Sequence, residues 1–170
     1  MAQVDYFLKL SGIDGESTDD KHKGEIEVLS FSWGVSQTGN KGSGGGAGKV
    51  NFNDFSIIKT VDTSTPALMV ACCSGQHIPE ATFTARKAGK EQQEFLVIKL
   101  TDLLVSSVAP GGSAGEAALP MEQISFSFGG SMITAVRQNP DGTFEKAVSQ
   151  TLCGGSQSFD GPVLEQKQRR

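Results

Sequence analysis

One serine of this sequence lies in a pattern that is typical of a catalytic nucleophile. Gly111-Gly112-Ser113-Ala114-Gly115 matches the G-x-S-x-G motif. That motif exposes its serine on a sharp turn, with a strand directly before it and a helix directly after it. Here Pro110 stands directly before the motif, and Pro120 and a predicted strand follow. We therefore interpret Ser113 as a loop residue, and a small hydrolase that uses Ser113 is the alternative in the class of enzymes.

A second candidate is the glycine-rich stretch that ends at Gly48-Lys49. A phosphate-binding loop needs glycine, four residues, glycine, lysine and then serine or threonine. Ser43 stands at the first glycine position, and Val50 stands at the position of the magnesium-binding hydroxyl. A strand is predicted to follow, whereas a phosphate-binding loop leads into a helix. The sequence therefore argues against nucleotide binding here.

The cysteines and histidines form no metal-binding pattern. Cys72 and Cys73 adjoin each other in a predicted helix, where their side chains point about 100° apart and are badly placed to chelate one ion. His22 and His77 have no second ligand at a suitable spacing. With Cys153 the cysteines number three, which makes no disulfide framework and is typical of reduced thiols. We expect no catalytic residue, no metal and no cofactor.

Composition limits the class of protein. A chain of 170 residues with 37% hydrophobic and 20% charged residues is expected to form one folded domain rather than a disordered chain. No apolar run reaches the ~18 residues of a membrane helix, so we expect no membrane partner. The net charge of -4 argues against nucleic acid as a partner. The first residues lack the basic and apolar regions of a Sec-type signal peptide, and we expect none.

The elements that would position these residues are mainly strands. Twenty-one glycines and ten phenylalanines favour β-structure with long loops. Strands predicted from Glu25 to Val35 and from Val50 to Val61 change their apolar face partway, at Val28-Leu29 and near Asn53-Asp54. Such a switch predicts a bulge, or a strand that passes from one packing layer to another. Clean alternation of apolar and polar residues predicts further strands at 4–10, 81–86 and 124–128.

Two further strand features lie later in the chain. The segment Phe95–Val108 is apolar on both faces, which predicts the core on one side and a helix or a subunit on the other. Asn139-Pro140-Asp141-Gly142 predicts a turn between the last two strands. By contrast, Gly12–Gly24 reads as a polar, charged loop.

One helix is predicted over Pro66–Ser74. Thr65 can cap its N-terminus, the proline suits its first turn, and Gly75 fits its end. The run from Leu68 to Cys73 places apolar side chains nearly all round the helix. We therefore expect the helix to be buried on most sides.

A series of motifs between about residues 3 and 130 occurs in the order found in one protein family. The motifs are Gly15-Glu16-Ser17, Asp19–His22, Glu25–Gly34, Gly44–Val50 with Asp54-Phe55, Asp62–Pro66, Ala71-Cys72, Ser74–His77, Arg86–Gly89, and Leu104–Val108 with Gly111–Ser113. Together they resemble the Hcp proteins, the tube subunits of bacterial type VI secretion. The segment 147–170 departs from the family pattern because it lacks the closing strand with Gly-Trp.

The resemblance implies a mainly β fold: a compact two-sheet β-barrel with one short α-helix and long Gly-rich loops. Residues 1–153 would form this single domain, and 154–170 would be a tail without a clear pattern. It also implies homohexameric rings that stack into a tube inside a contractile sheath with spike proteins. Such a protein assembles in the cytoplasm and is exported by the apparatus itself. The alternative role is a specialised secreted carrier that binds small effector proteins in the ring lumen.

Within that assembly the sequence offers three kinds of contact residue. Ser32 lies opposite Phe31 and Trp33 on its strand, so we expect it at the lumen wall, in contact with an effector or with solvent. Met69 and Val70 cannot both face the same way as Leu68, so we expect at least one of them at a subunit contact, and Val70 is the predicted contact residue. The glycine-rich arm is expected to order against a neighbouring subunit or ring, the alternative being a mobile loop. Its predicted contact residues are Gly39, Lys41, Gly42, Gly44, Gly45, Gly46 and Gly48.

Overall fold

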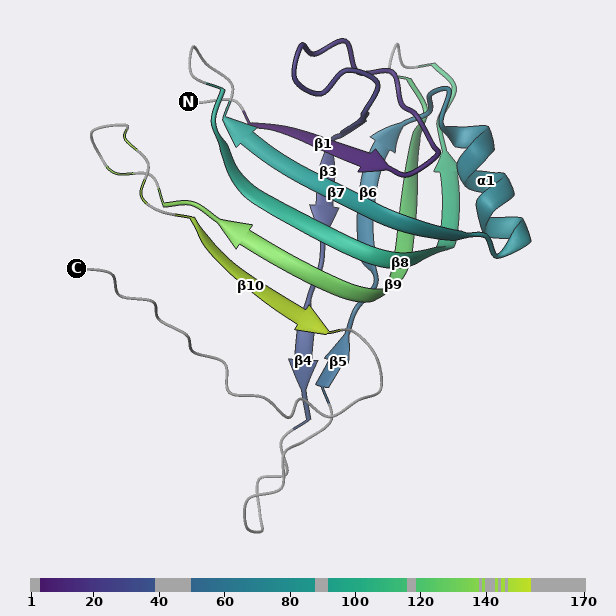
Figure 1. Cartoon of the computed structure of the whole chain (residues 1–170). Helices are drawn as coiled ribbons and strands as arrows, with labels where there is room; N and C mark the ends of the chain where they lie inside the picture. The colour runs from purple at the N-terminus through teal and green to yellow at the C-terminus, as the bar shows by residue number, and fades with distance from the viewer. Residues whose placement is uncertain are drawn as a thin grey trace, which may run out of the picture.

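The computed structural model describes residues 4–38, 50–87, 92–115, 119–137, 139, 143, 145 and 147–153. The main strands are β1 (Val4–Leu10), β2 (Ile26–Val28), β3 (Ser30–Ser32), β6 (Phe55–Thr60), β7 (His77–Lys87), β8 (Glu94–Gly111), β9 (Met121–Ala135) and β10 (Val148–Cys153). They form one sheet in the order β2-β1-β7-β8-β9-β6-β3, with β10 also paired to β9. This sheet curls into a nearly closed barrel (Figure 1), so the predicted mainly β fold is confirmed.

The barrel closes where the chain passes from β2 to β3. β2 pairs with β1, whereas β3 pairs with β6 at the other end of the strand order. Leu29 lies between them, and its N–H donates a hydrogen bond to the carbonyl oxygen of Ile58 at 2.8 Å. The predicted change of layer at Val28-Leu29 is confirmed, although the predicted strand 25–35 is three short strands rather than one.

A second interruption separates a small ribbon from the barrel. β4 (Val35–Gln37) and β5 (Val50–Phe52) pair with each other in a separate two-stranded sheet. The ribbon extends from one end of the barrel (Figure 1). Asn53 follows it, donating its N–H to the carbonyl oxygen of Gly34 at 2.9 Å, and β6 begins at Phe55. The predicted switch near Asn53-Asp54 is therefore confirmed.

Aromatic rings fill the centre of the barrel. Phe31, Phe55 and Phe83 come from β3, β6 and β7, and the last two are fully buried. The ring centroids of Phe31 and Phe83 lie 4.5 Å apart, and those of Phe55 and Phe83 lie 5.4 Å apart. Contacts of this kind add about 0.5–1.5 kcal/mol each beyond the burial of apolar area. Trp33 packs edge-on against Phe55 at the ribbon end of the barrel.

The long strand β8 exchanges its two faces at Asp102. Ile98 and Leu100 are buried before it, and Leu103 and Val105 are buried after it. Asp102 has φ 52, in the left-handed region, which turns its side chain and resets the alternation. The apolar residues on both predicted faces of this strand therefore belong largely to one core face.

The helix α1 (Thr65–Ser74) packs against β8 and ends as predicted at Gly75, whose φ is 64. Two predictions about it are wrong. Ser64, rather than Thr65, occupies the N-cap position. The helix is also buried on one side only, because Thr65, Leu68 and Ala71 are its buried residues in this chain. Within the described part of the chain, no helix is both long enough and apolar enough to cross a membrane.

Candidate functional site

Ser32 lies in a row of serines that crosses four strands. The strand register pairs Ser32 with Ser56, Ser56 with Ser125, and Ser125 with Ser107. The hydroxyl oxygens of Ser56 and Ser125 are hydrogen-bonded at 2.9 Å. Ser32 is exposed, while Phe31 beside it packs on the core, so the row lies on the outward face of the sheet. The sequence analysis singled out Ser32 alone and missed the other three.

The next two rows on one side of these serines are also uncharged, whereas Asp54 lies on the other side and accepts a hydrogen bond from the Ser106 hydroxyl at 2.6 Å. The residues that follow along the same face are, by register, Ser30, Ile58, Gln123 and Ala109, and then Thr60, Met121 and Gly111. The charged residues of β6 and β9, Lys59 and Glu122, point into the molecule and are fully buried. The serine row and the two rows beyond it therefore offer hydroxyl, amide and apolar groups, and Asp54 adds a negative charge beside the row.

The buried Lys59 and Glu122 hold the first turn of α1 against the sheet. The Lys59 Nζ lies 2.5 Å from Glu122 Oε1 and 2.6 Å from Asp62 Oδ1. The Thr65 hydroxyl, at the start of the helix, donates to Glu122 Oε1 at 2.7 Å. Burial raises the pKa of Asp62, but hydrogen bonds from Lys59 and Ser64 outweigh it, and the pKa of Asp62 lies below its ordinary value. These bonds fix the direction in which the helix presents its exposed side.

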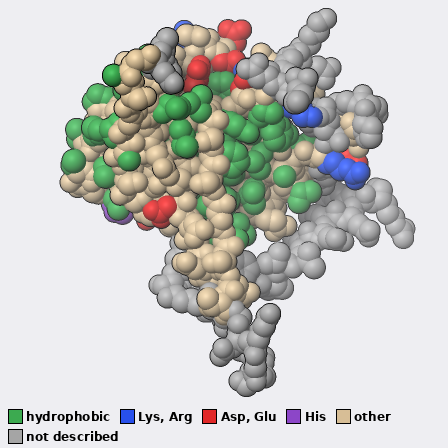
Figure 2. Space-filling model, turned by 180° about the vertical axis from the view of Figure 1, so that it is seen from behind, with side chains coloured by type: hydrophobic (Ala, Val, Ile, Leu, Met, Phe, Trp, Pro, Cys, Tyr) green, Lys and Arg blue, Asp and Glu red, His purple; other side chains and the backbone are tan. Residues whose placement is uncertain are grey.

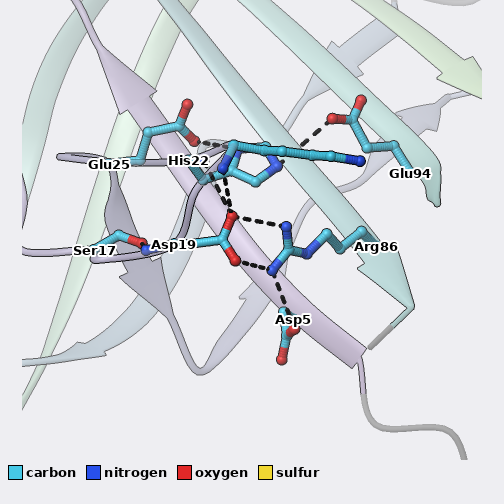
Figure 3. Close-up of polar contacts among 8 residues, drawn as sticks. Asp5, Ser17, Asp19, His22, Glu25, Arg86 and Glu94 are labelled. Atoms are coloured by element: carbon cyan, nitrogen blue, oxygen red, sulfur yellow. Dashed lines mark hydrogen bonds and ion pairs between the residues drawn. The ribbon is translucent and has the colours of Figure 1, made fainter. Parts of the chain in front are cut away.

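A second polar cluster joins the loop between β1 and β2 to the outside of the sheet (Figure 3). The buried Arg86 donates from Nη1 to Asp19 Oδ1 at 2.8 Å and from Nη2 to Asp19 Oδ2. Asp19 Oδ1 also accepts the backbone N–H groups of Lys21 and His22. The hydrogen bond from Arg86 is the main reason that the pKa of Asp19 lies well below its usual range, and the same bond raises the pKa of Arg86.

The aromatic ring of Phe7 packs against the side chains of this cluster. The ring of His22 stacks on it with centroids 4.3 Å apart and planes 7° apart, and the Arg86 guanidinium carbon lies 4.8 Å from its centroid. Thr84 and Arg86 are buried as well, although their polar side chains alternate with the apolar core residues of β7. The loop predicted as polar and charged thus covers the outer face of β1 and β7, which the sequence analysis missed.

The residues with possible chemistry are dispersed in the structure. Ser113 is exposed and lies two residues after the end of β8, which includes Pro110. The next element that the structure describes is the strand β9 rather than a helix. His77 is exposed and pairs with Asp102 at 2.7 Å. Cys72 is half-buried and Cys73 is exposed. Among the described residues, no group of three His, Cys, Asp or Glu side chains is placed to hold a metal ion.

The predicted contact residues lie on separate parts of the surface. Val70 on α1 is 63% exposed, whereas Ser32 lies on β3. The glycine-rich arm would connect β4 to β5, the two strands of the ribbon. Its predicted contact residues, Gly39, Lys41, Gly42, Gly44, Gly45, Gly46 and Gly48, lie outside the described residues, as does the segment 154–170.

Comparisons with known proteins agree with this fold. Residues 7–135 match the family model described as "Type VI secretion system effector, Hcp". The chain is 50% identical to Protein hcp1 of Pseudomonas aeruginosa over 142 residues, which covers 82% of this chain and 87% of that protein. A solved structure of a type six secretion system protein superimposes with a TM-score of 0.84 at 30% identity, covering 89% of this chain and 96% of the other. The crystal structure of Hcp1 from Salmonella typhimurium gives a TM-score of 0.71 at 38% identity, covering 88% and 94%. The chain therefore belongs to the Hcp family of type VI secretion system proteins.

Proposed function

We propose that this chain is a structural subunit of the inner tube of a type VI secretion system. It forms homohexameric rings, which stack inside the sheath behind the spike proteins and leave the cell with the apparatus. Membership of a family of secreted apparatus proteins supports this role.

The observation that supports the ring proposal is an apolar part of the described surface that remains exposed to solvent. β10 pairs with the second half of β9, whereas β6 pairs with its first half, so β10 extends beyond the closed part of the barrel. The register places Val148 beside Ala135 and Leu96, on the same face as the buried Ile98. Val148 is 63% exposed, as is Val70 on the helix.

Apolar surface of this kind favours association. Figure 2 shows hydrophobic side chains exposed in several groups on the face that it presents. Burial of apolar area contributes about 25 cal/mol per Å². A second copy that covers Val148 or Val70 would therefore remove an unfavourable contact with water.

Sedimentation velocity tests the ring. We expect one major species with about six times the 17.9 kDa mass of the chain over a wide range of concentration. A monomer at every concentration would contradict the ring and, with it, the tube.

The second role, a carrier of effector proteins, is supported by the uncharged serine row. In a ring whose lumen is lined by this face, Ser32 would contact the passenger through its hydroxyl. Ser32→Gln should leave the rings intact, because Ser32 is exposed, and should weaken retention of a bound effector. Ser11→Gln, at an exposed position in the turn after β1, is the matched control. Unchanged co-purification of every effector with Ser32→Gln would count against the carrier role but not against the ring.

A further inference from the structure

His22 lies between two carboxylates, one beside each ring nitrogen. Its Nδ1 is 2.8 Å from Glu25 Oε2, a hydrogen-bond distance, and its Nε2 is 3.6 Å from Glu94 Oε1 (Figure 3). The His22 side chain is only 6% exposed and is held flat by its stack on Phe7. Its Nε2 has no hydrogen-bond partner within the described structure, although the atom is buried.

The neutral ring cannot satisfy both carboxylates. A neutral imidazole carries a hydrogen on one nitrogen and a lone pair on the other. If Nδ1 donates to Glu25, the lone pair of Nε2 faces the oxygen of Glu94; the other tautomer reverses the mismatch. The doubly protonated ring donates from both nitrogens, so it alone fits both neighbours. A buried polar atom without a partner is costly.

The surrounding charges act in the same direction. Two carboxylates face the ring nitrogens, Glu25 from the β1–β2 connection and Glu94 from β8. Asp19 accepts the backbone N–H of His22, and Asp5 lies beside Arg86. Arg86 from β7 is the cation among these partners, and it is bound to Asp19 and Asp5. A positive charge on His22 therefore lies between the carboxylates of Glu25 and Glu94.

We propose that His22 is a protonation-dependent latch. At mildly acidic pH the charged ring bridges Glu25 to Glu94 and ties the β1–β2 connection to the first residue of β8. At higher pH the bond to Glu94 is absent, and the connection is held by the remaining contacts: Asp19 with Arg86, the stack of His22 on Phe7, and Glu16 with the backbone N–H of Thr63. Histidine suits this task because it is the side chain whose ordinary ionisation falls between about pH 5 and 8.

Hydrogen–deuterium exchange of the full chain tests the latch. The amides of Gly15, Ser17 and Gly24 bond within the connection and report its opening. After correction for the intrinsic exchange rate, we expect their protection to be roughly two- to five-fold greater at about pH 5.5 than at about pH 7.5, the range of a partly exposed ion pair. Amides in the middle of β8 serve as the internal reference for global opening.

Two substitutions of Glu94 give opposite predictions. Glu94→Ala removes the acceptor, so protection should be low and equal at both pH values. The amide of Glu94→Gln can donate to the bare Nε2 of the neutral ring, so protection should stay high at both pH values. Glu94 is 46% exposed, so neither change disturbs the core. Glu80→Ala, at an exposed position on β7, should keep the wild-type response. A wild-type pH response in Glu94→Ala, or none in the wild type, would overturn the latch.

Discussion

The ammonium group of Lys59 and the carboxylate of Glu122 meet at 2.5 Å, and both side chains are fully shielded from solvent. Removing one partner leaves the other charged and buried, which costs about 3–5 kcal/mol. We therefore expect Lys59→Met to lower the free energy of unfolding by about that amount in urea denaturation.

The double variant Lys59→Met/Glu122→Gln is the control for this ion pair. It removes both charges, so we expect it to be more stable than Lys59→Met alone. Equal stability of Lys59→Met and the wild type would show that the pair does not hold α1 in place.

Asp19 predicts how stability responds to acid. Its pKa is lowered in the folded chain by Arg86, so its contribution is present above the ordinary carboxyl pKa of 3.8 and is lost as pH falls towards the folded value. Asp19→Asn should cost about 1.5–3 kcal/mol at neutral pH, as for a hydrogen bond to a charged group. The stability difference from the wild type should shrink below about pH 4. Asp14→Asn, at an exposed position in the same loop, should show neither effect in denaturant titrations at a series of pH values.

Gly15 is expected to tolerate no side chain. A Cβ at this position would lie 2.4 Å from the carbonyl oxygen of Glu25 and 2.6 Å from the Cα of Ile26, and both are backbone atoms. Gly15→Ala should therefore lower thermal stability by the equivalent of about 1–3 kcal/mol, as overpacking does. At Gly111 a Cβ would meet nothing within 4 Å, so Gly111→Ala should melt within a degree or two of the wild type.

The exposed side of α1 is expected to serve assembly rather than folding. Val70→Arg adds a charge at a position that is 63% exposed, so the chain should fold with an unchanged circular dichroism spectrum and fail to form rings in size-exclusion chromatography. Leu68→Ala, two residues earlier on the same helix but facing the core, should instead cost about 2–5 kcal/mol of stability. Intact rings of Val70→Arg would remove this residue from the subunit contact.

The local parity of apolar residues was enough to predict where two strands are interrupted. The switches at Val28-Leu29 and Asn53-Asp54 are visible because a strand shows its buried face every second residue. The start and end of α1 were predictable for a similar reason, since Pro66 and Gly75 act through backbone geometry that depends on few neighbours.

The clusters that hold the surface loop were not predictable in this way. Arg86 and Asp19 are 67 residues apart, and nothing near either residue in the sequence indicates the other. The serine row could not be predicted for the same reason, because Ser32, Ser56 and Ser125 become neighbours only through the strand register. The reversal at Asp102 was also missed, although the adjacent glycines at 129 and 130 of the partner strand were a signal for it.

The passage of the chain through Leu29 has a mechanical consequence. The first and last strands of the sheet order, β2 and β3, are joined by this one residue, so the seam between them is bridged by the covalent backbone. The Cα atoms of Val28 and Ser30 can separate by at most about 7 Å. A load that pulls the seam apart is therefore carried by peptide bonds, and the barrel yields only after β2 is stripped from β1 or β3 from β6.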